Sequence, residues 1–164
     1  MKGRYGMINY DARKLVQTII MNEENKAKFY KTISEKAADR FAKNTFLRLS
    51  EEEEMHVKLY ADILENLPNS GKLQLPEDEV EYMEILITAN IFANEKVMRK
   101  FMDIDLQQLI EKIERDSILL RVQLKRLFPE YREKEMDMIL KEEKKHLKIA
   151  TDKHLGMILA NVEL

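Results

Sequence analysis

The fold of this chain is decided by two short stretches of sequence, LSEEEEMH at residues 49–56 and LKEEKKHL at residues 140–147. Each holds a Glu-x-x-His motif: Glu53 with His56, and Glu143 with His146. Residues three apart are neighbours on an α-helix, so each motif places a carboxylate beside an imidazole on one helix face. The two motifs lie 90 positions apart, which indicates an internal repeat.

Both motifs interrupt stripes of apolar residues. Four segments carry apolar side chains at spacings of three and four, the pattern of helices that pack in an antiparallel bundle. The middle of each stripe is charged, at Glu23, at Glu53 and His56, at Glu114, and at Glu143 and His146. Glu23 and Glu114 are 91 positions apart. The repeat unit is therefore a helix that carries a glutamate, a corner where the chain turns, and a second helix that carries Glu-x-x-His.

These charged positions predict a metal centre. A carboxylate in an apolar core is costly unless it is paired or binds a metal, and four of them together require a cation. Each glutamate lies 14 or 15 residues from a corner near Ala38 or Pro129. That is about 22 Å of helix, so all four reach nearly the same depth. Glu53 and Glu143 are the expected bridging ligands of two metals ~4 Å apart. The carboxylate oxygens and imidazole nitrogens of this centre suit iron, manganese or zinc alike.

The rest of the sequence favours an all-α chain of one domain, residues 1–164. Sustained strand alternation is missing, and 4 glycines offer few hairpin turns. Four long helices and one crossover helix are expected. Their ranges are Asp11 to about Ala37, Asp39 (as cap) to about Leu67, Asp78 to Met102 for the crossover, Asp103 or Asp105 to near Phe128, and Pro129 almost to the end.

Composition excludes several classes of protein. Lys and Arg total 28 against 30 acids, which argues against nucleic-acid binding. The absence of cysteine excludes disulfides, iron–sulfur clusters and thiolate metal sites from these residues. The longest charge-free run of the most apolar stretch, residues 85–94, is too short to span a membrane. We expect a cytoplasmic protein that contacts neither membrane nor nucleic acid.

The two halves of the chain resemble the two halves of a rubrerythrin-like, ferritin-like di-iron domain. The first half, residues 19–61, has Glu23 followed by Tyr30 and LSEEEEMH; the second, residues 109–153, has IERDSILL, LFPE and LKEEKKHL. The resemblance implies a ferritin-like four-helix bundle, reactions with oxygen or peroxide, and a homodimer. It also implies two iron ions, with the ligands Glu23, Glu53, His56, Glu114, Glu143 and His146.

The chain departs from that family at three places. It has no cysteine-held iron to feed electrons to the centre, so an external donor such as rubredoxin is expected. Ser117 stands where a seventh carboxylate is often found, and Glu111 is either a substitute or, as we favour, an exposed residue. Leu120 and Arg121 replace an aromatic pair. Arg121 either points inward or, in the favoured interpretation, extends from the helix boundary to solvent.

Three functions remain open from the sequence. The first is a di-iron oxidoreductase that reduces hydrogen peroxide or oxygen. The second is iron oxidation and storage, as in ferritins, and the third is a structural bundle that binds zinc or no metal. For Tyr30 we expect a ring that fills the core and a hydroxyl that hydrogen-bonds a ligand carboxylate. His154 has no partner carboxylate in register and is expected at the surface.

Overall fold

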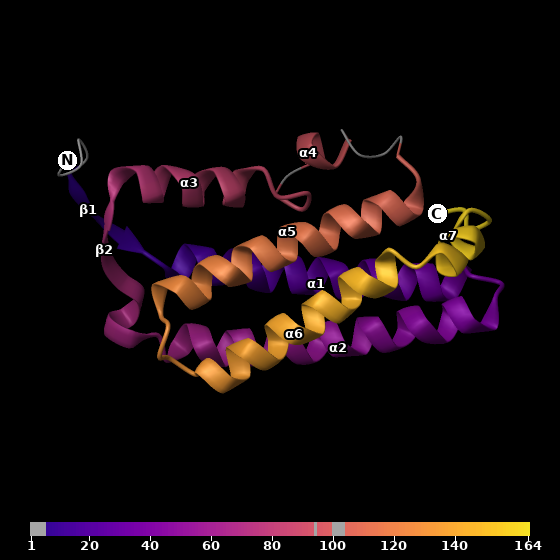
Figure 1. Cartoon of the computed structure of the whole chain (residues 1–164), viewed down its shortest axis with the longest axis horizontal. Helices are drawn as coiled ribbons and strands as arrows, with labels where there is room; N and C mark the ends of the chain where they lie inside the picture. Colours follow the sequence, from indigo (N-terminus) through magenta and orange to yellow (C-terminus); the bar gives the residue numbers. More distant parts are fainter. Residues whose placement is uncertain (1–5, 94, 100–103) are drawn as a thin grey trace.

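Four long helices run side by side along the molecule and form the bundle (Figure 1). The computed structural model describes residues 6–93, 95–99 and 104–164. The bundle helices are α1 (Arg13–Lys36), α2 (Arg40–Glu65), α5 (Leu106–Leu127) and α6 (Glu133–Ala150). The predicted all-α, ferritin-like bundle with a crossover between its second and third long helices is confirmed. No helix within the described residues is both long and apolar enough to cross a membrane.

A small sheet joins the two ends of the first helix pair. Strand β1 (Met7–Asp11) pairs antiparallel with β2 (Lys72–Pro76), with Met7 opposite Pro76. The sequence did not indicate this sheet, because strands of five residues are too short to show a clear alternation. The expected cap Asp11 is also the last residue of β1. Its Oδ1 accepts from the backbone N–H of Arg13 at 3.0 Å, while Ala12 is the N-cap of α1.

The crossover between the helix pairs is not one continuous helix. It contains the short 3-10 helix η1 (Pro68–Gly71), α3 (Glu77–Thr88) and α4 (Glu95–Arg99). The predicted helix from Asp78 breaks after Thr88, because Asn90 accepts the backbone N–H of Phe92 at 2.9 Å and so stabilises a turn. Figure 1 shows that the crossover still travels along the bundle beside α5. The expected end at Met102 and the start at Asp103 lie outside the described residues.

Aspartates begin three of the helices. Asp39 accepts from the N–H of Ala42 at 2.9 Å, as predicted for this cap, and Asp105 accepts from the N–H of Gln108 at 2.9 Å at the start of α5. The predicted last helix is interrupted, since α6 ends at Ala150 and α7 (Lys153–Leu159) follows. Asp152 caps α7 through the N–H of Leu155 at 2.8 Å. His154, which follows this cap, is exposed, as expected.

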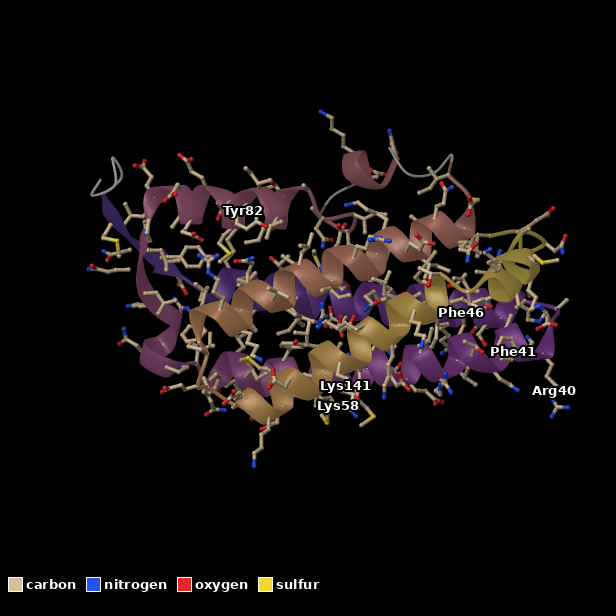
Figure 2. All side chains as sticks on the ribbon, viewed as in Figure 1. Arg40, Phe41, Phe46, Lys58, Tyr82 and Lys141 are labelled. Atoms are coloured by element: carbon tan, nitrogen blue, oxygen red, sulfur yellow. The ribbon has the colours of Figure 1, made fainter. Side chains whose placement is uncertain are left out.

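The apolar core is divided into two clusters along the bundle. One, which includes Leu15, Ile63 and Ile139, lies toward the sheet; the other includes Ile33 and Phe46 and lies toward α7. Figure 2 labels Phe46, which is buried on α2, and also Lys58 of α2 and Lys141 of α6, which are both exposed. The two clusters leave a level between them that is filled by charged side chains. This level is the depth at which the sequence placed the four glutamates.

Candidate metal centre

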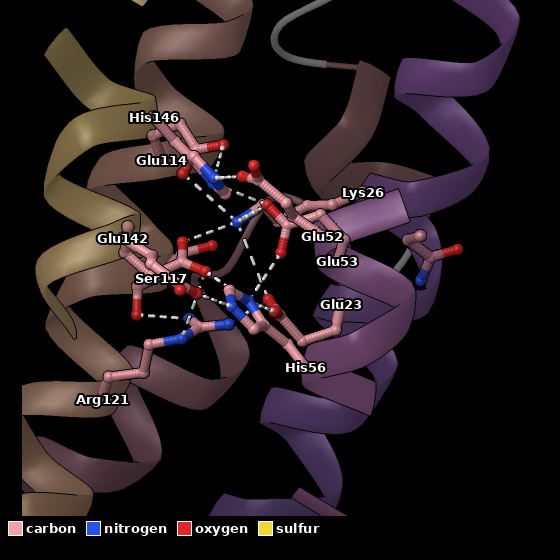
Figure 3. Close-up of polar contacts among 12 residues, drawn as sticks. Glu23, Lys26, Glu52, Glu53, His56, Glu114, Ser117, Arg121, Glu142 and His146 are labelled. Carbon is pink, nitrogen blue, oxygen red and sulfur yellow. Dashed lines mark hydrogen bonds and ion pairs between the residues drawn. The ribbon is translucent and has the colours of Figure 1, made fainter. Parts of the chain in front are cut away.

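The six residues that the sequence singled out converge at the middle of the bundle (Figure 3). Their exposed fractions are 0% for each of the four glutamates, 4% for His56 and 2% for His146. They form two donor sets in which one ligand atom from each residue lies within 4.8 Å of the others. The first set is Glu23, Glu53, His56 and Glu143, and the second is Glu53, Glu114, Glu143 and His146. Glu53 and Glu143 are shared between the sets.

The first set is built around the imidazole of His56. Its Nδ1 lies 2.9 Å from Glu23 Oε2, 3.2 Å from Glu53 Oε2 and 3.1 Å from Glu143 Oε1. Ligand atoms ~2.1 Å from one ion are separated by about 3 Å, which these distances match. Four donors from α1, α2 and α6 therefore surround one small volume.

In the second set, Glu53 presents the oxygen that does not face His56. His146 Nδ1 lies 2.9 Å from Glu53 Oε1 and 4.0 Å from Glu114 Oε1. Here α5 contributes the terminal carboxylate in place of α1. The longest distance between the histidine nitrogen and a carboxylate oxygen is therefore greater in the second set than in the first.

Two further glutamates contact the histidines through Nε2, the ring nitrogen that does not face the donor set. His56 Nε2 donates to Glu142 Oε2 at 2.6 Å, and His146 Nε2 donates to Glu52 Oε2 at 2.6 Å. Each bond joins one Glu-x-x-His helix to the other. A carboxylate on Nε2 directs Nδ1 toward the donor set. Neither residue was predicted from the sequence, although each directly precedes the glutamate of a motif, at positions 52 and 142.

Lys26 is a buried cation in the centre that was not predicted from the sequence. Its side chain is 0% exposed, and its Nζ contacts all four buried carboxylates. The distances are 2.7 Å to Glu143 Oε2, 2.9 Å to Glu53 Oε1, 3.2 Å to Glu114 Oε2 and 3.6 Å to Glu23 Oε1. Burial opposes its charge, but the carboxylates outweigh burial and raise the pKa of Lys26 well above the usual value. Its position could have indicated this placement, because Lys26 follows Glu23 by three residues on the same apolar stripe.

Arg121 points into the centre, so the favoured expectation of a solvent-directed side chain is wrong. It is 3% exposed, and its Nη2 donates to Glu23 Oε1. Its Nε lies 3.7 Å from Glu143 Oε1, and its Nη1 donates to the carbonyl oxygen of Ser117 at 2.6 Å. The guanidinium also lies over the ring of Tyr60, 5.4 Å from the centroid. Partners within the core draw Arg121 inward.

Tyr30 and Glu111 resolve the two other open questions about side-chain placement. The Tyr30 hydroxyl donates to Glu114 Oε1, and its fully buried ring packs against Phe46 at 5.6 Å between centroids. Both halves of that expectation agree with the geometry. Glu111 is half-buried on α5, pairs with Arg115 at 3.9 Å and belongs to neither donor set. It does not replace the seventh carboxylate.

The electrostatics divide the four carboxyl groups into two kinds. Burial raises the pKa of Glu23 to about 7 and the pKa of Glu114 to about 8. Burial acts on the shared pair too, but Lys26 lowers the pKa of Glu53 and Arg121 lowers the pKa of Glu143. The shared carboxylates are thus the most strongly held anions of the centre.

Fold and site together define a class: a ferritin-like helical bundle with a buried carboxylate and histidine cluster that can hold metal. The family model described as Rubrerythrin matches residues 14–153, and the chain belongs to that family. The match includes all six converging residues as well as Lys26 and Arg121. No curated protein and no solved structure matches the chain.

Proposed function

We propose that this chain is a non-haem iron oxidoreductase that reduces hydrogen peroxide or oxygen with electrons from an external donor. The observation that carries the proposal is the pair of donor sets that share Glu53 and Glu143, each completed by one histidine and one terminal glutamate. Carboxylate oxygens and imidazole nitrogens are suitable iron ligands. Manganese or zinc would fit the same atoms, and membership of the rubrerythrin family favours iron.

The proposed ligands are Glu23, Glu53, His56, Glu114, Glu143 and His146, which would hold two iron ions if both sets were filled. Bound iron supplies electron transfer, because it cycles between the ferrous and ferric states. Reduction of one hydrogen peroxide to two waters consumes two electrons and two protons. The electrons come from ferrous iron and, for continued turnover, from the donor.

The chain's own residues orient the donors and keep bulk water out. Glu142 and Glu52 fix the rings of His56 and His146. Tyr30 holds Glu114 and Arg121 holds Glu23. The apolar clusters on either side of the charged level limit access by water, which strengthens the electrostatic interactions within it. Small uncharged molecules such as peroxide are the substrates that suit so enclosed a site.

The proposal includes a donor outside these residues. The 164 residues contain no cysteine, so they hold neither a thiolate iron centre nor a disulfide couple. A rubredoxin-like electron-transfer protein is the proposed donor, a second copy of the chain the proposed partner in a dimer, and the cytoplasm the proposed location. Membership of the rubrerythrin family supports the donor and the dimer.

Rapid mixing of the ferrous protein with hydrogen peroxide tests this function. We expect oxidation of the protein's iron to be faster than that of free Fe(II) in the same buffer. One peroxide should be consumed per two ferrous ions, after which the reaction should stop. Addition of a rubredoxin and its reductase should convert this burst into steady consumption. Oxidation no faster than that of free Fe(II) would contradict the proposal.

A second candidate function is favoured by Lys26 and Arg121. These buried cations neutralise part of the carboxylate charge without any metal, as a purely structural bundle would require. Elemental analysis of protein purified without added metal, and again after anaerobic loading with Fe(II), separates the two functions. Protein that takes up no metal under either condition would establish the structural bundle.

A further inference from the structure

The ammonium of Lys26 lies against one of the two donor sets and not equally against both. Its three shortest carboxylate contacts are to Glu143 Oε2, Glu53 Oε1 and Glu114 Oε2, at 2.7, 2.9 and 3.2 Å. These three glutamates are the carboxylates of the second set. The fourth contact, 3.6 Å to Glu23 Oε1, involves an oxygen that already accepts from Arg121.

The shared carboxylates divide their two oxygens between a histidine and the lysine. Glu53 Oε2 and Glu143 Oε1 face His56, together with Glu23 Oε2. Glu53 Oε1 and Glu143 Oε2 face Lys26. The first set thus keeps one oxygen from each of its three carboxylates gathered around the His56 nitrogen. In the second set an ammonium already contacts the corresponding oxygens.

The charges of the cluster agree with this division. When all four buried glutamates are ionised they carry four negative charges, and Lys26 and Arg121 carry two positive ones. His56 is neutral when it binds metal. His146 holds no metal in this arrangement, and a positive charge on it is balanced by Glu52, which its Nε2 contacts at 2.6 Å. Glu142 is partly exposed, so water compensates its charge. One divalent ion therefore completes the balance. A second would leave two excess positive charges in the core, one of them beside the Lys26 ammonium.

The geometry points to a centre that takes a single divalent transition-metal ion. The ion is held by Glu23, Glu53, His56 and Glu143, and the ammonium of Lys26 replaces the second ion between Glu53, Glu114 and Glu143. This inference deepens the proposed function and rests on its claim that the cluster binds metal. The centre is then asymmetric: a metal and a lysine share the same two bridging carboxylates.

The metal content of the protein tests this inference directly. The wild-type chain, Lys26→Met and Lys28→Met are loaded anaerobically with Co(II), passed through a desalting column and analysed for cobalt per chain. Methionine removes the charge of Lys26 and keeps a side chain of similar length. Lys28 is exposed on the same helix and serves as the matched control. We expect one ion in the wild type, two in Lys26→Met and one in Lys28→Met.

The other outcomes are distinguishable. Two ions in the wild type, or a single ion in folded Lys26→Met, would overturn the role of Lys26 and leave the proposed function standing. No ion in the wild type would overturn the inference and the proposed function together.

A second pair of variants decides the matter if Lys26→Met does not fold. His56 and His146 are matched, because each is buried and each donates to a glutamate at 2.6 Å. We expect His56→Ala to lose the cobalt and its visible absorption, and His146→Ala to keep both. Thermal melts establish that the variants are folded. Equal losses from the two variants, or loss from His146→Ala alone, would overturn the inference.

Discussion

The pair α1–α2 and the pair α5–α6 are two versions of one unit, and they handle charge differently. Residues 51–60 and 141–150 show the same pattern of buried and exposed positions, residue for residue. Tyr30 and Arg121 each follow a terminal glutamate by seven positions and reach across to the terminal glutamate of the other half. The burial pattern of the repeat and its contacts between the halves are thus symmetric.

The side chains that compensate charge are not symmetric. Three positions after its terminal glutamate, the first half has Lys26 and the second half has Ser117. Lys26 from α1 reaches the second donor set, and Arg121 from α5 reaches Glu23 in the first. The comparison shows that a repeat can keep its ligands while each half places a different cation in the core.

The largest expected effect comes from removing a carboxylate that both halves share. Glu53→Ala should lose metal binding and destabilise the metal-free protein by about 3–5 kcal/mol, because Lys26 and both histidines lose a buried partner. Glu143→Ala should behave alike. Metal analysis and urea unfolding measure the two effects. Glu54→Ala, at an exposed neighbouring position, is the control. Full metal content in both Ala variants would disprove the ligand assignment.

The next largest effects concern Arg121 and Tyr30, whose side chains each contact a glutamate of the other half. Arg121→Leu leaves Glu23 without its cation and should cost about 3 kcal/mol in the metal-free protein. Tyr30→Phe removes one hydrogen bond to Glu114 and should cost about 1.5 kcal/mol. Chemical unfolding of both variants gives the ratio. Arg121→Leu should also weaken azide binding to the loaded protein, since a cation near the site is lost. Equal costs for the two variants would mean that the charge of Arg121 contributes nothing.

A smaller effect separates the two histidine supports. Glu142→Gln weakens the orientation of His56 and should lower the metal affinity of the filled set by about 10- to 100-fold. Glu52→Gln alters the support of His146, which faces the set that Lys26 occupies, and should leave the affinity almost unchanged. Competition with a coloured chelator measures both affinities. A matched loss in the two variants would indicate that both sets bind metal.

The smallest effect lies in the sheet, which belongs to the first half alone because β1 precedes α1 and β2 follows α2. Hydrogen bonds from Arg13 lower the pKa of Asp11 to about 2. The folded pKa is below the usual value, so the ionised carboxylate stabilises above about pH 4 and this contribution is lost as pH falls toward 2. Asp11 is exposed, and Asp11→Asn should cost less than about 1 kcal/mol at pH 7. Thermal melts should show this difference shrinking below pH 4.

The sequence was informative wherever a residue's type and spacing fixed its role. Glutamates and histidines are rarely buried on an apolar stripe unless they bind a metal or a charged partner. Glu23, Glu114 and the two motifs could therefore be assigned to one site. Asp39 was recognisable as a cap for a similar reason, since its short side chain bonds only to nearby backbone. The helix start after Asp105 was recognised too.

The remainder depended on where long side chains end and on contacts between distant residues. Lys26 and Arg121 have flexible stems, and spacing does not say whether the charge turns toward solvent or toward buried carboxylates. The break at Asn90 rests partly on Asp116, which accepts the backbone N–H of Ile91 at 3.3 Å from another helix. The two short strands pair residues that lie 61 to 69 positions apart, from Asp11 with Lys72 to Met7 with Pro76. Such contacts become visible only in the folded chain.

Crystals of the wild-type protein grown with Mn(II) test the central claim most directly. Anomalous scattering at the manganese edge locates the metal without any assumption about ligands. We expect one strong peak among Glu23, Glu53, His56 and Glu143. The Lys26 ammonium should lie between Glu53, Glu114 and Glu143. Two peaks of equal height would contradict the role of Lys26. The absence of any peak in the bundle would contradict the metal centre itself.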